Sequence, residues 1–187
     1  LVALGTGRYP MSVADVAGVL WQRVTSADRG GTADTVVWQV RMPRVVLGGI
    51  VGAMLSLAGA SYQGVFRNPL VDPYLLGAAA GAGLGATLVF TELRSSTAAW
   101  PVDPAPAMAF LFALLTVLVT YTVGASFGGA RTGVTLVLAG VAVTSLATAA
   151  QTFLLQRNVE VVREVYNWIL GRLSSARWAD VRMVLPY

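Results

Sequence analysis

The stretch from Val37 to Gly85, VWQVRMPRVVLGGIVGAMLSLAGASYQGVFRNPLVDPYLLGAAAGAGLG, carries the most informative pattern in this chain. Two arginines, Arg41 and Arg44, flank Pro43, and a run without charged residues follows them. A short polar elbow then interrupts the apolar sequence, and a series of glycines comes after it. Apolar runs separated by short polar breaks are typical of a chain that crosses a membrane several times.

The composition of the whole chain also indicates a membrane protein. Of its 187 residues 56% are hydrophobic and only 12% are charged, and the mean hydropathy is +0.67. Soluble domains carry about 25% charged residues, so the lipid bilayer is the expected solvent here. The sequence has no Cys and no His, which excludes disulfides and His- or Cys-ligated metals within it. Its net charge of +4 forms no basic cluster, so no nucleic-acid partner is expected.

Four charge-free runs, each 19 to 27 residues long, mark the expected membrane spans. About 20 helical residues cross a bilayer core of about 30 Å, and backbone groups in hydrocarbon must be satisfied within the chain. The expected spans are residues 45–66, 73–91, 104–130 and 132–156. We therefore expect an all-α fold, a polytopic bundle of membrane helices that forms one transmembrane domain over residues 1–187.

Two amphipathic segments are expected beside the spans. A short helix should begin at Ser12, its N-cap, with Asp15 three residues later. The tail over residues 157–182 has apolar residues at helical spacing and is expected to be an interfacial helix. Trp168 and Trp178 on this tail fit the level of the lipid headgroups.

Glycines and prolines punctuate the start of the second span. Gly77, Gly81 and Gly85 recur at every fourth position and are expected on one helical face, where small residues let membrane helices pack closely. Lining of a pathway is the alternative role for these glycines. The segments Asn68-Pro69-Leu70 and Asp72-Pro73 predict a rigid elbow, in which Asp72 caps the next helix and Pro73 takes its first position.

Polar residues inside the spans are few and uncharged. Hydroxyl groups in membrane helices often bond back to their own backbone, which is the simplest interpretation of those in the third and fourth spans. Thr144, Thr148 and Gln151 lie close to one helical face, together with Ser145 and Thr152, and this mild polar stripe would suit a wide, weakly binding passage. No charged residue lies inside any expected span, which disfavours a proton relay or an ion-coupled carrier.

The sequence resembles the permease subunits of the FecCD-type ABC importers, which take up ferric siderophores, haem or cobalamin. The resemblance is strongest over residues 38–85, continues at LVLAG over residues 136–140, and is recognisable at YNWILG over residues 166–171. It implies a type II importer permease of ten helices. Of these, the present chain, which does not begin with Met, would hold the end of helix 1 to the start of helix 6. Ferric siderophore is the expected cargo, with haem or cobalamin as alternatives.

The resemblance also implies roles for particular residues. Arg41 and Arg44 match arginines that face outward in the family and dock acidic residues of a soluble substrate-binding protein, because a guanidinium pairs well with a carboxylate. Interfacial anchoring of the span is the alternative role for both. The elbow with Asn68 would be cytoplasmic. The family's inner gate lies near the turn before its fifth helix, where Thr132 and Thr135 are the candidates.

The implied topology places the elbow and the turn at residues 128–135 in the cytoplasm, and residues 92–104 and 157–180 outside. A count of positive charges in the loops would give the opposite orientation. The implied partners are a second permease subunit, either identical or paralogous, a pair of ATP-binding subunits and the substrate-binding protein, in a bacterial cytoplasmic membrane. No catalytic residue, cofactor or metal is expected within the chain. An ion-coupled secondary transporter is the alternative function, and it would need intramembrane carboxylates.

Overall fold

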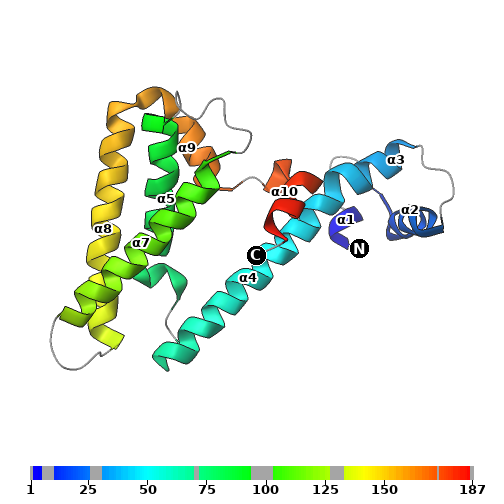
Figure 1. The fold of residues 1–187 in the computed structure, drawn as a ribbon. Helices are drawn as coiled ribbons and strands as arrows, with labels where there is room; N and C mark the ends of the chain where they lie inside the picture. The colour runs from blue at the N-terminus through cyan, green and yellow to red at the C-terminus, as the bar shows by residue number, and fades with distance from the viewer. Residues whose placement is uncertain are drawn as a thin grey trace. The chain divides into compact units, whose positions relative to one another are not determined.

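The structure is a computed structural model that describes residues 2–5, 11–25, 31–69, 72–93, 103–126, 133–171 and 173–185. Within these residues the regular structure is entirely helical, which confirms the predicted all-α fold class. The chain divides into two compact units, whose helices are drawn in Figure 1. Unit 1 contains residues 1–56 and 172–187, and unit 2 contains residues 57–171.

A long apolar helix begins in unit 1. It consists of α3 (Thr32–Thr35), the π-helical turn η1 (Val36–Arg41) and α4 (Met42–Phe66), which follow one another without a break. The N–H of Met42 donates to the carbonyl of Val37, five residues back, and the next residue is a proline with no N–H to donate. The wider π turn thus accommodates the proline inside the helix instead of ending it there.

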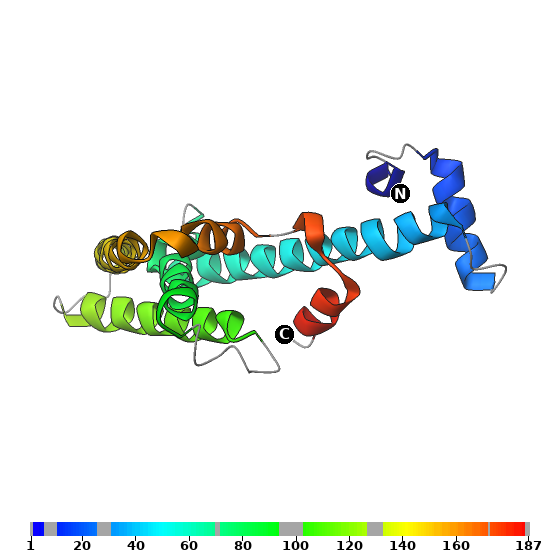
Figure 2. The same cartoon turned by 90° about the horizontal axis from the view of Figure 1, so that it is seen from above.

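Shorter helices pack around this segment in unit 1. They are α1 (Val2–Gly5), α2 (Val13–Thr25), the 3₁₀ turn η5 (Leu173–Ser175) and α10 (Trp178–Val184). Figure 2 shows α2 running across the axis of the long helix at its beginning. The buried residue of α2 is Val16, which is fully inaccessible to solvent.

A capping box starts α2, as the sequence predicted. The Ser12 N–H donates to Asp15 Oδ2 at 2.9 Å, and the Asp15 N–H donates to Ser12 Oγ at 3.1 Å. The Ser12 hydroxyl also donates to Asp15 Oδ2 at 2.7 Å. Hydrogen bonds from the Ser12 hydroxyl and backbone stabilise the carboxylate and hold the pKa of Asp15 below its usual value of 3.8.

Three mutually packed helices form the centre of unit 2. They are α5 (Ala78–Leu88), α7 (Ala105–Ser126) and α8 (Gly133–Arg157), and each contacts the other two (Figure 1). α5 is preceded by the 3₁₀ turn η2 (Pro73–Leu76) and continues into the π-helical turn η3 (Val89–Leu93). The second expected span, residues 73–91, is therefore built from three kinds of helical turn.

The remaining elements of unit 2 pack where α8 and the α5–η3 segment end. After α8 come η4 (Val159–Val161) and α9 (Val162–Ile169). A small apolar cluster of Leu155, Val161 and Val165 is buried there, with Phe90 and Val162 packed against it. α9 thus joins the end of α8 to the end of the α5–η3 segment.

The tail over residues 157–182 is not the single helix that its apolar spacing predicted. It consists of η4, α9, η5 and α10, and Gly171 after α9 has a left-handed φ of +76°. Glycine adopts this conformation without steric cost, and it is a common way to end a helix. The apolar spacing described α9 correctly but did not reveal where the helix stops.

Three described helices are long and apolar enough to cross a membrane, namely residues 32–66, 105–126 and 134–157. They contain or overlap the expected spans 45–66, 104–130 and 132–156. The segment Ala78–Leu93, within the expected span 73–91, is also apolar but shorter. The part of the third expected span after Ser126 lies outside the described residues.

Candidate docking and translocation surfaces

The two arginines of the RMPR segment lie inside the long helix rather than before it. Arg41 is the last residue of η1, and its side chain is only 7% exposed. Its guanidinium donates from Nη1 to the backbone carbonyl of Leu4 in α1. Arg44 is the third residue of α4 and is half-buried, and its Nε is buried without a hydrogen-bond partner among the described residues.

An aromatic cluster fixes the helix just before these arginines. The rings of Trp38 in η1 and Trp178 in α10 have centroids 5.1 Å apart, and the Trp178 indole N–H donates to the Trp38 carbonyl at 2.8 Å. Arg23 of α2 lies over the Trp38 ring at 4.7 Å and forms an ion pair with Asp34 at 3.0 Å. Three segments that are distant in the sequence therefore meet one turn before Arg41.

The elbow between α4 and η2 is shaped by its polar residues. Asp72 is the N-cap of η2, as predicted, and accepts a hydrogen bond from the N–H of Tyr74 at 2.6 Å, with Pro73 at the first position of the turn. Pro69 accepts at its carbonyl from the Gln63 side chain at 3.1 Å. Asn68 follows Arg67, which has a left-handed φ of 47°. Residues 70 and 71 of the elbow lie outside the described part of the chain.

Glycines on α5 allow a close approach of α7. A Cβ on Gly81 would overlap Thr116 Oγ1 and the carbonyl of Phe112, and a Cβ on Gly85 would overlap the carbonyl of Met108. Most of these neighbours are backbone atoms of α7, which cannot rotate away.

Gly77, the first glycine of the series, has a different role from the other two. It adopts φ +80° and separates η2 from α5, so it caps the turn instead of sharing the face of the helix. The left-handed conformation suits glycine because it has no Cβ to clash with the preceding carbonyl.

Two threonines of α7 bond to the backbone where η2 meets α5. Thr120 is fully buried, and its hydroxyl donates to the Leu76 carbonyl at 3.1 Å. Thr116 Oγ1 lies 3.1 Å from the Gly77 carbonyl and also within reach of two carbonyls of its own helix. The sequence predicted hydroxyl groups bonded to their own backbone, and it did not reveal this bonding between helices. The spacing of four residues, which places both hydroxyls on one face of α7, was the available signal.

The expected polar stripe on α8 divides into two sets. Thr144 and Gln151 face the second span: a Cβ on Gly77 would lie 3.3 Å from Thr144 Oγ1, and a Cβ on Gly83 would lie 3.1 Å from Gln151 Oε1. Thr148 is instead exposed, as are its neighbours on the helix, Ser145 and Thr152.

The exposed set keeps its hydroxyl groups bonded locally. Ser145 donates to the Val141 carbonyl at 2.8 Å, and Thr152 donates to the Thr148 carbonyl at 2.9 Å. The proton of each hydroxyl is thus engaged within the helix, while the oxygen lone pairs can still accept a hydrogen bond. Of the two gate candidates, Thr135 is half-buried near the start of α8, and Thr132 lies outside the described residues.

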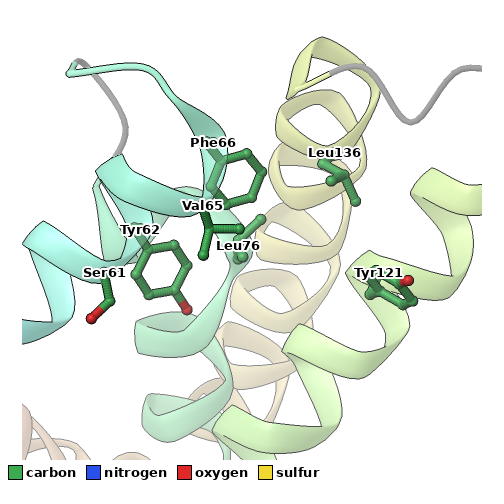
Figure 3. Close-up of a pocket in the computed structure, with 7 residues that line it drawn as sticks. All are labelled: Ser61, Tyr62, Val65, Phe66, Leu76, Tyr121 and Leu136. Atoms are coloured by element: carbon green, nitrogen blue, oxygen red, sulfur yellow. The ribbon is translucent and has the colours of Figure 1, made fainter.

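An open apolar cavity of about 460 Å³ lies beside the elbow (Figure 3). Its lining comes from the end of α4, from η2, and from the facing parts of α7 and α8. Tyr62 and Phe66, one turn apart on α4, have nearly parallel rings with centroids 6.2 Å apart. The lining residues are Ser61, Tyr62, Val65, Phe66, Leu76, Tyr121 and Leu136.

No group of three acidic, His or Cys side chains suited to a metal occurs in the described part of the chain. The charged side chains described there lie outside the middle of the three long apolar helices. The polar groups near the centre of the bundle are hydroxyls, one amide and backbone carbonyls. These polar groups are neutral, and those of Thr116 and Thr120 are buried between helices.

The chain is similar to known transport proteins. The FecCD transport family matches residues 1–187. The chain is 39% identical over 83% of its length to the cobalamin import system permease protein of Halobacterium salinarum, of which it covers 40%. It is 29% identical over 95% of its length to the molybdate import system permease protein of Haemophilus influenzae, of which it covers 51%.

A solved structure shares both the fold and part of the sequence. It is an inward-facing structure assigned to the metal-chelate type of ABC transporter, with a TM-score of 0.69 and 26% identity, over 95% of this chain and 51% of that one. The present chain thus spans about half the length of the relatives that it matches. Because the family match extends over every residue, the chain belongs to the FecCD transport family, and both relatives named above are import system permease proteins.

Proposed function

We propose that this chain is part of a permease subunit in a binding-protein-dependent ABC importer. The family match over residues 1–187 carries this proposal. Two permease subunits would enclose a passage, and a separate pair of ATPase subunits would supply the energy. ATP and the binding protein would act by shifting the population between outward-open and inward-open states, so the chain itself would catalyse no reaction.

The passage would be lined in part by the exposed face of α8. Ser145, Thr148 and Thr152 present short neutral side chains there, which suit a solute that must be released after each cycle. We assign Thr144 and Gln151 a supporting part, since both face the second span within the chain. Thr132 and Thr135, at the start of this helix, remain the proposed gate.

The binding protein would dock on the side where η1 meets α4. Arg44 is the stronger docking candidate, because its side chain is only half-buried, whereas Arg41 is 7% exposed. Arg41 is held against the Leu4 carbonyl, so its participation in docking would require that contact to open. The elbow around Asn68 and Pro69 would then face the cytoplasm, at the other end of α4.

The proposed cargo is a metal chelate, with ferric siderophore as the first candidate. Relatives of this chain import cobalamin and molybdate, so members of the family carry solutes of very different size. A neutral hydroxyl lining does not select among such solutes by charge, and selection would rest mainly with the binding protein. The bacterial cytoplasmic membrane is the proposed location.

The decisive experiment uses the full-length gene in cells that lack their own uptake systems. Accumulation would be measured for a panel of ferric siderophores, haem, cobalamin and molybdate, with and without the cognate binding protein. We expect uptake of one solute class that depends on both the binding protein and ATP. Uptake that follows the proton gradient and ignores the binding protein would contradict the importer proposal and favour an ion-coupled carrier.

Charge reversal tests the docking surface separately. Arg44→Glu should abolish stimulation by the binding protein while leaving the complex assembled, because it replaces an attractive contact with a repulsive one. Arg163→Glu, at an exposed position on α9, is the matched control and should retain stimulation. Arg41→Met should reduce the stability of the subunit, since it removes the donor to the Leu4 carbonyl of α1. Full stimulation of Arg44→Glu would refute the docking assignment and leave the importer proposal intact.

A further inference from the structure

The amphipathic helix α2 has an apolar face that nothing in the described structure covers. Val13 is 50% exposed, Trp21 is 70% exposed and Val24 is 81% exposed. With Ala17 and Leu20 these residues recur at intervals of three and four, so they form one stripe along the whole helix. No charged or polar side chain lies on the stripe.

The other two sides of α2 have different surroundings. One side packs inward through the buried Val16 and through Arg23, which pairs with Asp34 and lies over the Trp38 ring. The third side carries small and polar residues, among them the exposed Asp15 and Gln22. On a helical wheel the stripe and the polar side point in nearly opposite directions, and the packed side lies between them.

The orientation of α2 distinguishes the bilayer from other possible partners of this stripe. Figure 2 shows α2 running across the start of a helix that is itself long and apolar enough to span a membrane. Both the ion pair and the cation–π contact of Arg23 hold it in that crosswise position. A helix fixed across the end of a spanning helix lies in the plane of the membrane surface, with one side toward lipid and one toward water.

We propose that α2 is an in-plane anchor, whose stripe enters the boundary between lipid headgroups and acyl chains. Tryptophan is enriched at this level because its ring is apolar and its N–H is polar, and the exposed Trp21 belongs to the stripe. An amphipathic helix buries its apolar side about 5–10 Å into this boundary. The stripe would continue the lipid-facing surface of the adjoining span. The inference concerns lipid contact alone and holds whichever solute the permease carries.

Site-directed spin labelling can test this anchor, because the chain has no native Cys to compete for the label. Single cysteines would be placed in the full-length subunit, made cysteine-free, within the assembled transporter in lipid nanodiscs. Ala17→Cys on the stripe and Gly18→Cys toward the polar side form a matched pair, since both are exposed small residues of the same helix. Val24→Cys and Gln22→Cys form a second pair.

The readout is the collision rate of each nitroxide with oxygen, which dissolves in lipid, relative to a water-soluble nickel chelate. We expect this ratio to be several-fold higher at Ala17 and Val24 than at Gly18 and Gln22. Equal ratios dominated by the nickel chelate would show that the stripe faces water, and would overturn the proposal. Stripe positions shielded from both reagents would show that protein covers them, and would overturn it in favour of a protein partner. Transport by each labelled variant establishes that it has folded.

Discussion

Replacing Thr120 by valine should weaken the junction between the second and third spans. The substitution keeps the shape of the side chain but removes the donor to the Leu76 carbonyl, to which the Thr120 hydroxyl lies at 3.1 Å. Thr120 is fully buried, so water cannot replace the lost donor. Hydrogen bonds between membrane helices contribute about 0.6 kcal/mol on average and up to about 1.7 kcal/mol.

The burial of Thr120 places the expected loss toward the upper end of that range. A loss of about 1.7 kcal/mol corresponds to roughly a 20-fold change in the unfolding equilibrium constant, since 1.4 kcal/mol is tenfold. Thr116→Val should cost less, because the Thr116 hydroxyl has one proton and already has two acceptors in its own helix. Thr120→Ser retains the donor and should recover much of the loss.

The assay is reversible unfolding of the full-length subunit in mixed micelles with a rising mole fraction of SDS, followed by near-ultraviolet circular dichroism. Thr122→Val is the matched control: it lies two residues away, is exposed, and donates to Val119 of its own helix at 2.9 Å. If Thr120→Val and Thr122→Val unfold at the same SDS fraction, the contact with Leu76 does not stabilise the junction and the reasoning fails.

Three further results are expected. Gly140→Ala should destabilise the subunit by about 1–3 kcal/mol in the same SDS assay, because the new Cβ would overlap a backbone carbonyl of η2. Gly59→Ala is the control and should leave the stability unchanged, because the space around Gly59 is open in the described structure. Trp178→Phe keeps a ring against Trp38 but loses the indole donor, and should lower thermal stability by about 0.5–1.5 kcal/mol; an unchanged melting temperature would contradict this. The pKa of Asp15 is lowered on folding, so its stabilisation of α2 is complete above the ordinary value of 3.8 and is lost as the pH falls through the lower folded-state value. A nitroxide on α2 should therefore become more mobile below that pH, and Asp15→Asn should remove the pH dependence.

The helical architecture could be predicted well from the sequence because its strongest signals, apolar composition and the absence of charge, extend over long runs of residues. Charge-free runs locate apolar helices regardless of how the chain is bent, and the described helices α4, α7 and α8 coincide with three of them. Local capping rules were equally effective at Ser12 and at Asp72, where the side chain and its backbone partner are only a few residues apart.

What could not be predicted depends on contacts between distant residues. The ring contact of Trp38 with Trp178 joins positions 140 residues apart, and no pattern in either segment indicates the other. The burial of Arg41 follows from the position of α1, which periodicity does not determine. The left-handed Gly77 looked like a member of a helical series, because sequence spacing carries no information on φ.

The bonding around Gly77 has a consequence for ion binding. In many transporters a broken membrane helix binds cations through the backbone carbonyls that the break leaves free. Here the carbonyls of Leu76 and Gly77 each have a threonine hydroxyl within hydrogen-bond distance, so the dipoles of the break are already partly neutralised inside the protein. Each donated proton lies beside the carbonyl oxygen that a cation would approach, and it reduces the negative potential there. The break therefore attracts cations less than a broken helix whose carbonyls have no hydrogen-bond donor.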